Sequence, residues 1–256
     1  MSATNQANDN RLFQVILPKQ TRLRDAFAPI LQNAGFAFDR EKSRHAYGVC
    51  RDMRGKGADF EAAMRKPEDA LRKLRENKAD MAILGADKFI EARSKALAEG
   101  NEDAFKLDAV MDFNCAACSM YIAAAEDSSI TCAADLENKR IATSFPYSLE
   151  AWLAEQGVSN VEVIKCDGDT EDEIRDGSAD AIFEIVDSGQ SLIDNGLETK
   201  IWAYDINAVL VARSDLSLSQ NAQAAKTFMN RLVPPKISIA PQGPAVPVGV
   251  AGPCFA

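Results

Sequence analysis

The stretch from Asp180 to Leu192 reads Asp-Ala-Ile-Phe-Glu-Ile-Val-Asp-Ser-Gly-Gln-Ser-Leu and divides into three parts. Its apolar run, residues 181–186, predicts a buried strand. A polar loop, residues 187–191, follows, and a short helical pattern begins at Leu192. Unpaired N–H groups at the start of a helix can bind phosphate oxygens, so this strand-loop-helix order predicts an anion site.

The residue types of the loop suit a phosphate. Gly189 lacks the Cβ that would keep the backbone away from the ligand. Ser188 and Ser191 add hydroxyl donors. An alternative interpretation stays open on these residues alone: Ser188-Gly189 is an ordinary turn, and Ser188 caps the helix.

Three acidic residues accompany the loop: Asp180, Glu184 and Asp187. Carboxylates would repel a bare diphosphate. They suit ribose hydroxyls or Mg²⁺, which prefers oxygen ligands and substrate phosphates. Six acids lie just upstream between Asp167 and Asp176, where acids at a helix start are favourable for electrostatic reasons alone.

Short apolar runs alternate with helical patterns along the chain, which is typical of an α/β fold with largely parallel sheets. Helices are expected over 23–31 and 67–76, where apolar residues recur at helical spacing. The tail, residues 233–256, is rich in Pro and Gly and is expected to be flexible or extended, and residues 1–10 are expected to be disordered. The expected strands are 13–17, 81–84, 120–123, 141–143, 161–164, 181–186, 201–204 and 209–212.

Composition limits the function classes. The chain has 256 residues, 46% of them hydrophobic, which is enough for one large domain or two modest ones. No apolar run reaches 18 residues and the N-terminus is polar, so we expect a cytoplasmic protein with no membrane partner. The net charge of −9 argues against nucleic-acid binding. The locally basic segment from Arg40 to Lys78 is interpreted as a solvated face rather than a ligand surface.

Cysteine and histidine offer little catalytic chemistry. The six cysteines are scattered, which favours reduced thiols. Cys115 and Cys118 form a C-x-x-C pair that could be redox-active or half of a zinc site, but no second pair follows. The single histidine, His45, is interpreted as a loop residue, so neither a covalent nucleophile nor a metal site can be assigned.

The block from Gly168 to Leu197 resembles the signature of the ATP phosphoribosyltransferase family. Three further segments resemble that family in the same order: 17–23, 79–85 and 138–146. The likeness extends over roughly 11–232. Within the signature the matching residues are Glu171, Gly177, Ala179, Ile182, Ile185, Ser188, Gly189 and Leu192, with Glu184 and Ser191 where the family has Asp and Thr.

The resemblance implies a two-lobed α/β fold like that of type II periplasmic binding proteins, with mixed sheets flanked by helices. Lobe I would comprise 11–110 and 205–232. Lobe II, 111–204, would carry the phosphoribosyl diphosphate loop. The implied reaction transfers the phosphoribosyl group to N1 of ATP and releases pyrophosphate. This is the first step of histidine biosynthesis, and Mg²⁺ is the implied cofactor. Such chemistry depends mainly on positioning two phosphorylated substrates.

Ten residues are expected to bind substrate. Lys19 and Arg22 follow the first strand, where ligands bind in α/β sheets. The resemblance also implies a homo-oligomer and an accessory subunit similar to histidyl-tRNA synthetase, the partner of short family members. The full set of expected substrate contacts is Lys19, Arg22, Glu171, Asp180, Glu184, Asp187, Ser188, Gly189, Gln190 and Ser191.

The chain departs from the family pattern at expected anion contacts. If Cys118 is the counterpart of a family cysteine, Ser119 replaces an arginine, and Glu150 stands where basic residues are usual. These changes motivate an alternative hypothesis, a catalytically silent relative that binds a phosphorylated ligand or regulates a partner. A plain solute-binding module of the same fold would leave the loop unexplained.

Overall fold

The computed structural model describes residues 12–39, 47–53 and 60–232. These residues divide into two compact units, with boundaries between Ile83 and Leu84 and between Leu210 and Val211. The expectations for the first ten residues, the Pro-rich tail and His45 lie outside the described residues. The predicted lobe boundaries stay a prediction.

The larger sheet has seven strands in the order β2-β3-β4-β1-β5-β12-β6. Strand β1 pairs in parallel with both β4 and β5, whereas β3 pairs antiparallel with β2 and β4. The strands are β1 (Gln14–Pro18), β2 (Phe36–Asp39), β3 (Tyr47–Asp52), β4 (Phe60–Arg65), β5 (Met81–Gly85), β6 (Leu107–Asp112) and β12 (Ala208–Arg213). The helices in these parts of the chain are α1 (Thr21–Asn33), α2 (Pro67–Arg75), α3 (Ala86–Ala98), α4 (Glu102–Phe105), η2 (Leu216–Leu218) and α8 (Ala222–Leu232).

Aromatic side chains form the centre of the first unit. Phe13, Phe36, Phe60 and Phe228 are buried. Their ring centroids lie between 4.9 and 5.9 Å apart, mostly in edge-to-face geometry. Such pairs are favoured by the ring quadrupoles. The cluster packs α8 against strands that come from the opposite end of the sequence.

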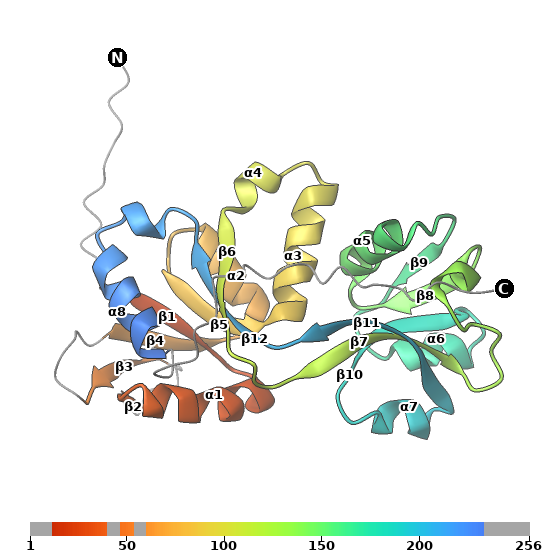
Figure 1. Cartoon of the computed structure of the whole chain (residues 1–256), viewed down its shortest axis with the longest axis horizontal. Coiled ribbons are helices and arrows are strands. Elements are labelled where there is room, and N and C mark those ends of the chain that lie inside the picture. The colour runs from red at the N-terminus through yellow and green to blue at the C-terminus, as the bar shows by residue number, and fades with distance from the viewer. Residues whose placement is uncertain (1–11, 40–46, 54–59, 233–256) are drawn as a thin grey trace, which may run out of the picture. The chain divides into compact units, whose positions relative to one another are not determined.

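The smaller sheet has five strands in the order β11-β7-β10-β8-β9. Strand β7 runs antiparallel to β10 and β11, while β8 runs parallel to β9 and β10. In Figure 1, β7 and β11 are a long antiparallel pair. The strands are β7 (Cys118–Ala125), β8 (Arg140–Thr143), β9 (Glu162–Lys165), β10 (Ala181–Val186) and β11 (Leu197–Ile206), and the helices are η1 (Ala133–Leu136), α5 (Pro146–Gln156), α6 (Thr170–Arg175) and α7 (Gln190–Asp194).

The two faces of this sheet bury different helices. Side chains alternate between the faces of a strand. Phe183 of β10 packs with Trp152 of α5, at 6.1 Å between ring centroids. The next residue back along the strand, Ile182, packs in the opposite cluster with Leu192 of α7. Strand β10 is therefore fixed from both faces, and the loop that follows it is held at the end of a rigid strand.

The predicted architecture is largely confirmed. All eight expected strands and both expected helices are present, and two mixed sheets flanked by helices form the fold. The sheets are mixed rather than largely parallel, because β3 and β7 are antiparallel to their neighbours. Strands β2, β3, β4 and β6 were not predicted.

Candidate functional site

The loop between β10 and α7 lines a cavity. Gly189 adopts φ +74° and ψ 0°, in the left-handed region that glycine enters without steric cost. The cavity has a volume of about 290 Å³. Its lining residues are Ser144, Gly168, Asp169, Thr170, Glu171, Glu184, Ile185, Val186, Asp187, Ser188, Gly189, Gln190, Ser191 and Leu192.

The cavity gathers seven of the ten predicted site residues. They are Glu171, Glu184, Asp187, Ser188, Gly189, Gln190 and Ser191. Sequence reasoning missed three polar neighbours, Ser144, Asp169 and Thr170. Ser144 follows β8, which is parallel to β10, so the two strand ends meet at one edge of the sheet. The expected parallel pairing of these two strands was the signal that could have identified Ser144.

A half-buried carboxylate forms part of the cavity wall. Glu184 Oε1 accepts a hydrogen bond from Ser144 N at 3.2 Å, and Oε2 accepts one from Ile185 N at 3.3 Å. Burial raises the pKa of the Glu184 carboxyl, and the two backbone donors oppose that shift only in part. The carboxyl is thereby fixed in place.

The serine hydroxyls of the loop have defined partners. Ser191 Oγ donates to Glu171 Oε1 at 2.5 Å, and Ser188 Oγ accepts from Gln190 N at 3.4 Å. Helix α7 has five residues, so its dipole is small, and donors of the loop itself are the main feature that favours an anion. A phosphate that takes the Ser191 hydroxyl must displace the Glu171 carboxylate.

The side chains that line the cavity give it an excess of negative charge. Four carboxylates line it, from Asp169, Glu171, Glu184 and Asp187, and none of the described residues that line it is Lys or Arg. A bare diphosphate would therefore be repelled, while a diphosphate neutralised by a divalent cation would not.

Asp180 lies outside this lining and has a structural partner. Its carboxylate accepts hydrogen bonds from Arg140 N at 2.9 Å and from Arg140 Nη2 at 2.8 Å. The guanidinium lowers the pKa of Asp180. The pair joins the starts of β8 and β10. A substrate contact by Asp180 stays a prediction.

Lys19 and Arg22 belong to the first unit and are exposed. Lys19 N donates to Arg65 O at 3.1 Å, which ties the end of β1 to the end of β4. Neither side chain is among the residues that line the loop cavity. Their proposed contacts with phosphate stay predictions.

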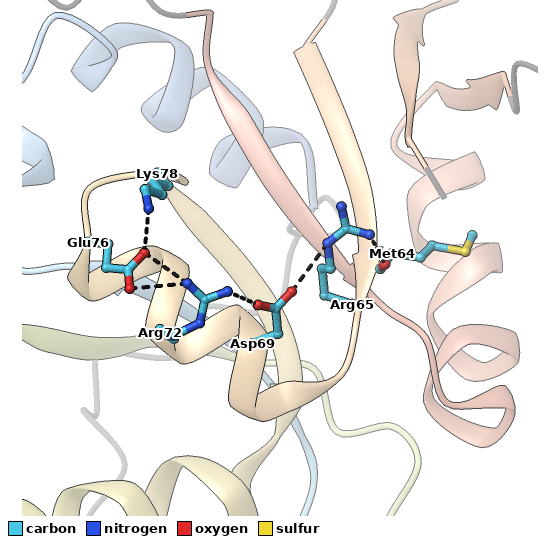
Figure 2. Close-up of polar contacts among 6 residues, drawn as sticks. All are labelled: Met64, Arg65, Asp69, Arg72, Glu76 and Lys78. Atoms are coloured by element: carbon cyan, nitrogen blue, oxygen red, sulfur yellow. Dashed lines mark hydrogen bonds and ion pairs between the residues drawn. The ribbon is translucent and has the colours of Figure 1, made fainter. Parts of the chain in front are cut away.

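Basic residues around α2 pair with neighbouring acids. Figure 2 shows a chain of polar contacts that runs from the end of β4 along α2 to Lys78. Arg65 Nε lies 3.3 Å from Asp69, Arg72 pairs with Asp69 and lies 2.9 Å from Glu76, and Lys78 lies 2.8 Å from Glu76. These contacts agree with the interpretation of a solvated face for this part of the basic segment.

The remaining sequence candidates form no second centre in the part of the chain that the structure describes. None of its five cysteines, Cys115 and Cys118 among them, is in a disulfide. No group of three or more His, Cys, Asp or Glu residues within the described ranges is arranged to hold a metal ion. None of the described helices is both long and apolar enough to span a membrane.

A family model and two curated relatives match this chain. The family model "HisG: ATP phosphoribosyltransferase" matches residues 66–233. An ATP phosphoribosyltransferase of Pseudarthrobacter chlorophenolicus is 29% identical over 224 residues, which cover 86% of this chain and 72% of the relative. One from Kocuria rhizophila is 32% identical over 187 residues, which cover 73% of this chain and 60% of the relative.

Solved structures with the same fold include enzymes and binding proteins. The ATP phosphoribosyl transferase (HisG:HisZ) complex from Thermotoga maritima matches with a TM-score of 0.64 at 22% identity, covering 86% of this chain and 96% of that one. The periplasmic aliphatic sulphonate binding protein SsuA from Escherichia coli matches with a TM-score of 0.53 at 13% identity, covering 87% and 71%. The second match confirms the fold implied for the two lobes. Because the family model matches well over half of the sequence, the chain belongs to the ATP phosphoribosyltransferase family.

Proposed function

We propose that this chain transfers the phosphoribosyl group of phosphoribosyl diphosphate to N1 of ATP with release of pyrophosphate, the first step of histidine biosynthesis. The observation that carries the proposal is the cavity at the β10–α7 loop, where the family's signature residues converge. The silent alternative is not favoured, because both relatives named above are described as the enzyme.

In this proposal the loop holds the phosphate and the strand end holds the sugar. Ser188 and Ser191 donate their hydroxyls, and the backbone at Gly189 allows a phosphate to approach closely. The carboxylates of Glu184 and Asp187 accept hydrogen bonds from ribose hydroxyls. The protein contributes chiefly by orienting the substrates, which can supply much of the rate enhancement of a bimolecular reaction.

Mg²⁺ fits this site as a companion of the diphosphate. The described residues form no cluster of three or more ligands, and Mg²⁺ commonly uses one or two carboxylates together with substrate phosphates. Asp187 and Glu171 are the candidate oxygen donors, since both line the cavity. When bound, the ion would neutralise the leaving pyrophosphate.

We also propose that the chain works in the cytoplasm as a homo-oligomer with an accessory subunit. The similarity to a chain of the HisG:HisZ complex supports the proposed subunit.

The test is pyrophosphate release by the full chain, assayed with ATP, Mg²⁺ and phosphoribosyl diphosphate, with and without the accessory subunit. Release that requires both substrates is the expected result. Absence of turnover in both preparations would contradict the proposal, and phosphoribosyl diphosphate binding without turnover would point to the silent alternative.

A further inference from the structure

A second cavity adjoins the cavity at the β10–α7 loop. It has a volume of about 690 Å³ and shares Val186, Asp187, Ser188 and Gly189 with the first, so both open on the same loop. The other lining residues come from β7, from β11 and from the segments that flank these strands. They are Asn114, Ala117, Cys118, Ser119, Tyr121, Thr199, Asp205 and Asn207.

One carboxylate in this cavity is held in a fixed orientation. Asp205 Oδ1 accepts hydrogen bonds from Ser119 Oγ at 2.7 Å and from Trp202 Nε1 at 3.0 Å. Within the described part of the chain, Oδ2 has no hydrogen-bond partner. The carboxylate can therefore offer Oδ2 to a ligand without giving up either of the bonds that orient it.

The chemistry of the cavity favours a neutral heterocycle that carries N–H donors. None of the described lining residues is Lys or Arg, and Asp187 and Asp205 are acidic, so this cavity disfavours a polyphosphate. Tyr121 lines the cavity with Asp205 and lies opposite Trp202 on the paired strand, and the Trp202 indole donates to Asp205. Aromatic side chains are surfaces on which nucleobases stack.

We propose that Asp205 is the residue that selects the acceptor base: its Oδ2 accepts a hydrogen bond from the exocyclic amino group of an aminopurine bound in the second cavity. This inference rests on the proposed function, because it assumes that the acceptor lies next to the phosphoribosyl group. The Ser119 hydroxyl serves to orient Asp205. The polyphosphate of the acceptor would bind outside this cavity.

The test compares ATP with purine riboside 5′-triphosphate, which lacks only the amino group. Calorimetric titration of the full wild-type chain should show ATP binding about ten- to a hundredfold tighter, the range for a hydrogen bond to a charged acceptor. In Asp205→Asn the amide oxygen would keep the Ser119 and Trp202 bonds and present NH₂ to the base. The variant should then bind the two nucleotides with about equal affinity.

Asp205→Ala should lose the preference for ATP as well. The control is Asp108→Asn, which changes the charge by the same amount as Asp205→Asn at an exposed residue of β6 that lines neither cavity, and it should retain the preference. Equal affinity of the wild type for both nucleotides, or an unchanged preference in Asp205→Asn, would overturn the proposal. Pyrophosphate release separates the two claims. If the chain releases pyrophosphate but its preference for ATP does not depend on Asp205, only the base-binding role of Asp205 is refuted. If the preference depends on Asp205 but no pyrophosphate is released, only the proposed reaction is refuted.

Discussion

Replacing Glu91 by alanine should destabilise the unit that contains the β10–α7 loop. Helix α5 has no side-chain cap of its own at Phe145. Instead, Glu91 of α3 accepts hydrogen bonds from Tyr147 N at 3.3 Å, Ser148 N at 2.8 Å and Ser148 Oγ at 2.7 Å. Lys88 lies over the ring of Phe145 at 4.3 Å, one helical turn from Glu91. Helix α3 therefore caps α5 through space.

The expected decrease in the free energy of unfolding can be estimated from these contacts. Loss of the carboxylate that caps a helix start costs about 1 kcal/mol. Ser148 is 2% exposed, so its hydroxyl would lose its acceptor away from water, at about 1–3 kcal/mol. Glu91→Ala should thus lower the free energy of unfolding by about 2–4 kcal/mol. Because the two residues share these bonds, Glu91→Ala combined with Ser148→Ala should cost less than the sum of the single changes.

The assay is urea unfolding followed by tryptophan fluorescence in a Trp202→Phe background. Trp152 of α5 is then the only tryptophan, and it reports on this unit directly. A local probe is needed because two units can unfold in separate steps. Glu91→Gln, which keeps an acceptor oxygen, should lose less than Glu91→Ala. A change below about 0.5 kcal/mol for Glu91→Ala, typical of an uninvolved surface site, would refute the capping role.

Three further substitutions test the electrostatics. Burial raises the pKa of Glu184, so its charged form destabilises the fold as pH rises above the ordinary carboxyl range. In urea titrations Glu184→Gln should therefore be more stable than wild type at pH 7, and this gain in stability should vanish near pH 4. Arg140 lowers the pKa of Asp180, so the pair stabilises at neutral pH and its contribution is lost as pH falls through the folded pKa. Asp180→Asn should cost about 1 kcal/mol or less at pH 7 and almost nothing at pH 2, by the same assay. Arg72→Ala should leave the melting temperature nearly unchanged, because its ion pairs are solvated; a large drop in calorimetry would contradict the solvated face.

The strands that sequence patterns identified are those with continuous apolar runs. The missed strands have weaker patterns: β6 carries Asp at both its second and last positions, and β3 contains a glycine. Strand β11 is longer than predicted, because its polar ends extend the strand and two register shifts against β7 interrupt the alternation. Register and bulges depend on the partner strand, which a single-sequence pattern does not contain.

The candidate site was predicted where its residues are contiguous. Loop residues 187–191 and Glu184 lie close together in the chain. Residue type and spacing identified them as an anion site or an ordinary turn, and the resemblance to the family favoured the anion site. The contacts of Asp180 with Arg140 and of Glu184 with Ser144 each span 40 residues. The cap by Glu91 spans 57 residues to Ser148. Such contacts follow from the folded topology rather than from local pattern.

The most direct measurement of the central claim is calorimetric titration of the full chain with Mg²⁺ and phosphoribosyl diphosphate, comparing Gly189→Trp with Gly196→Trp. Both glycines have positive φ, +74° and +66°, so both changes strain the backbone, but only Gly189 lines the cavity. If the loop binds the diphosphate substrate, Gly189→Trp should weaken binding about a hundredfold or more, a loss of roughly 3 kcal/mol, while Gly196→Trp stays within about twofold of wild type. Unchanged affinity in Gly189→Trp, or equal losses in both variants, would contradict the account.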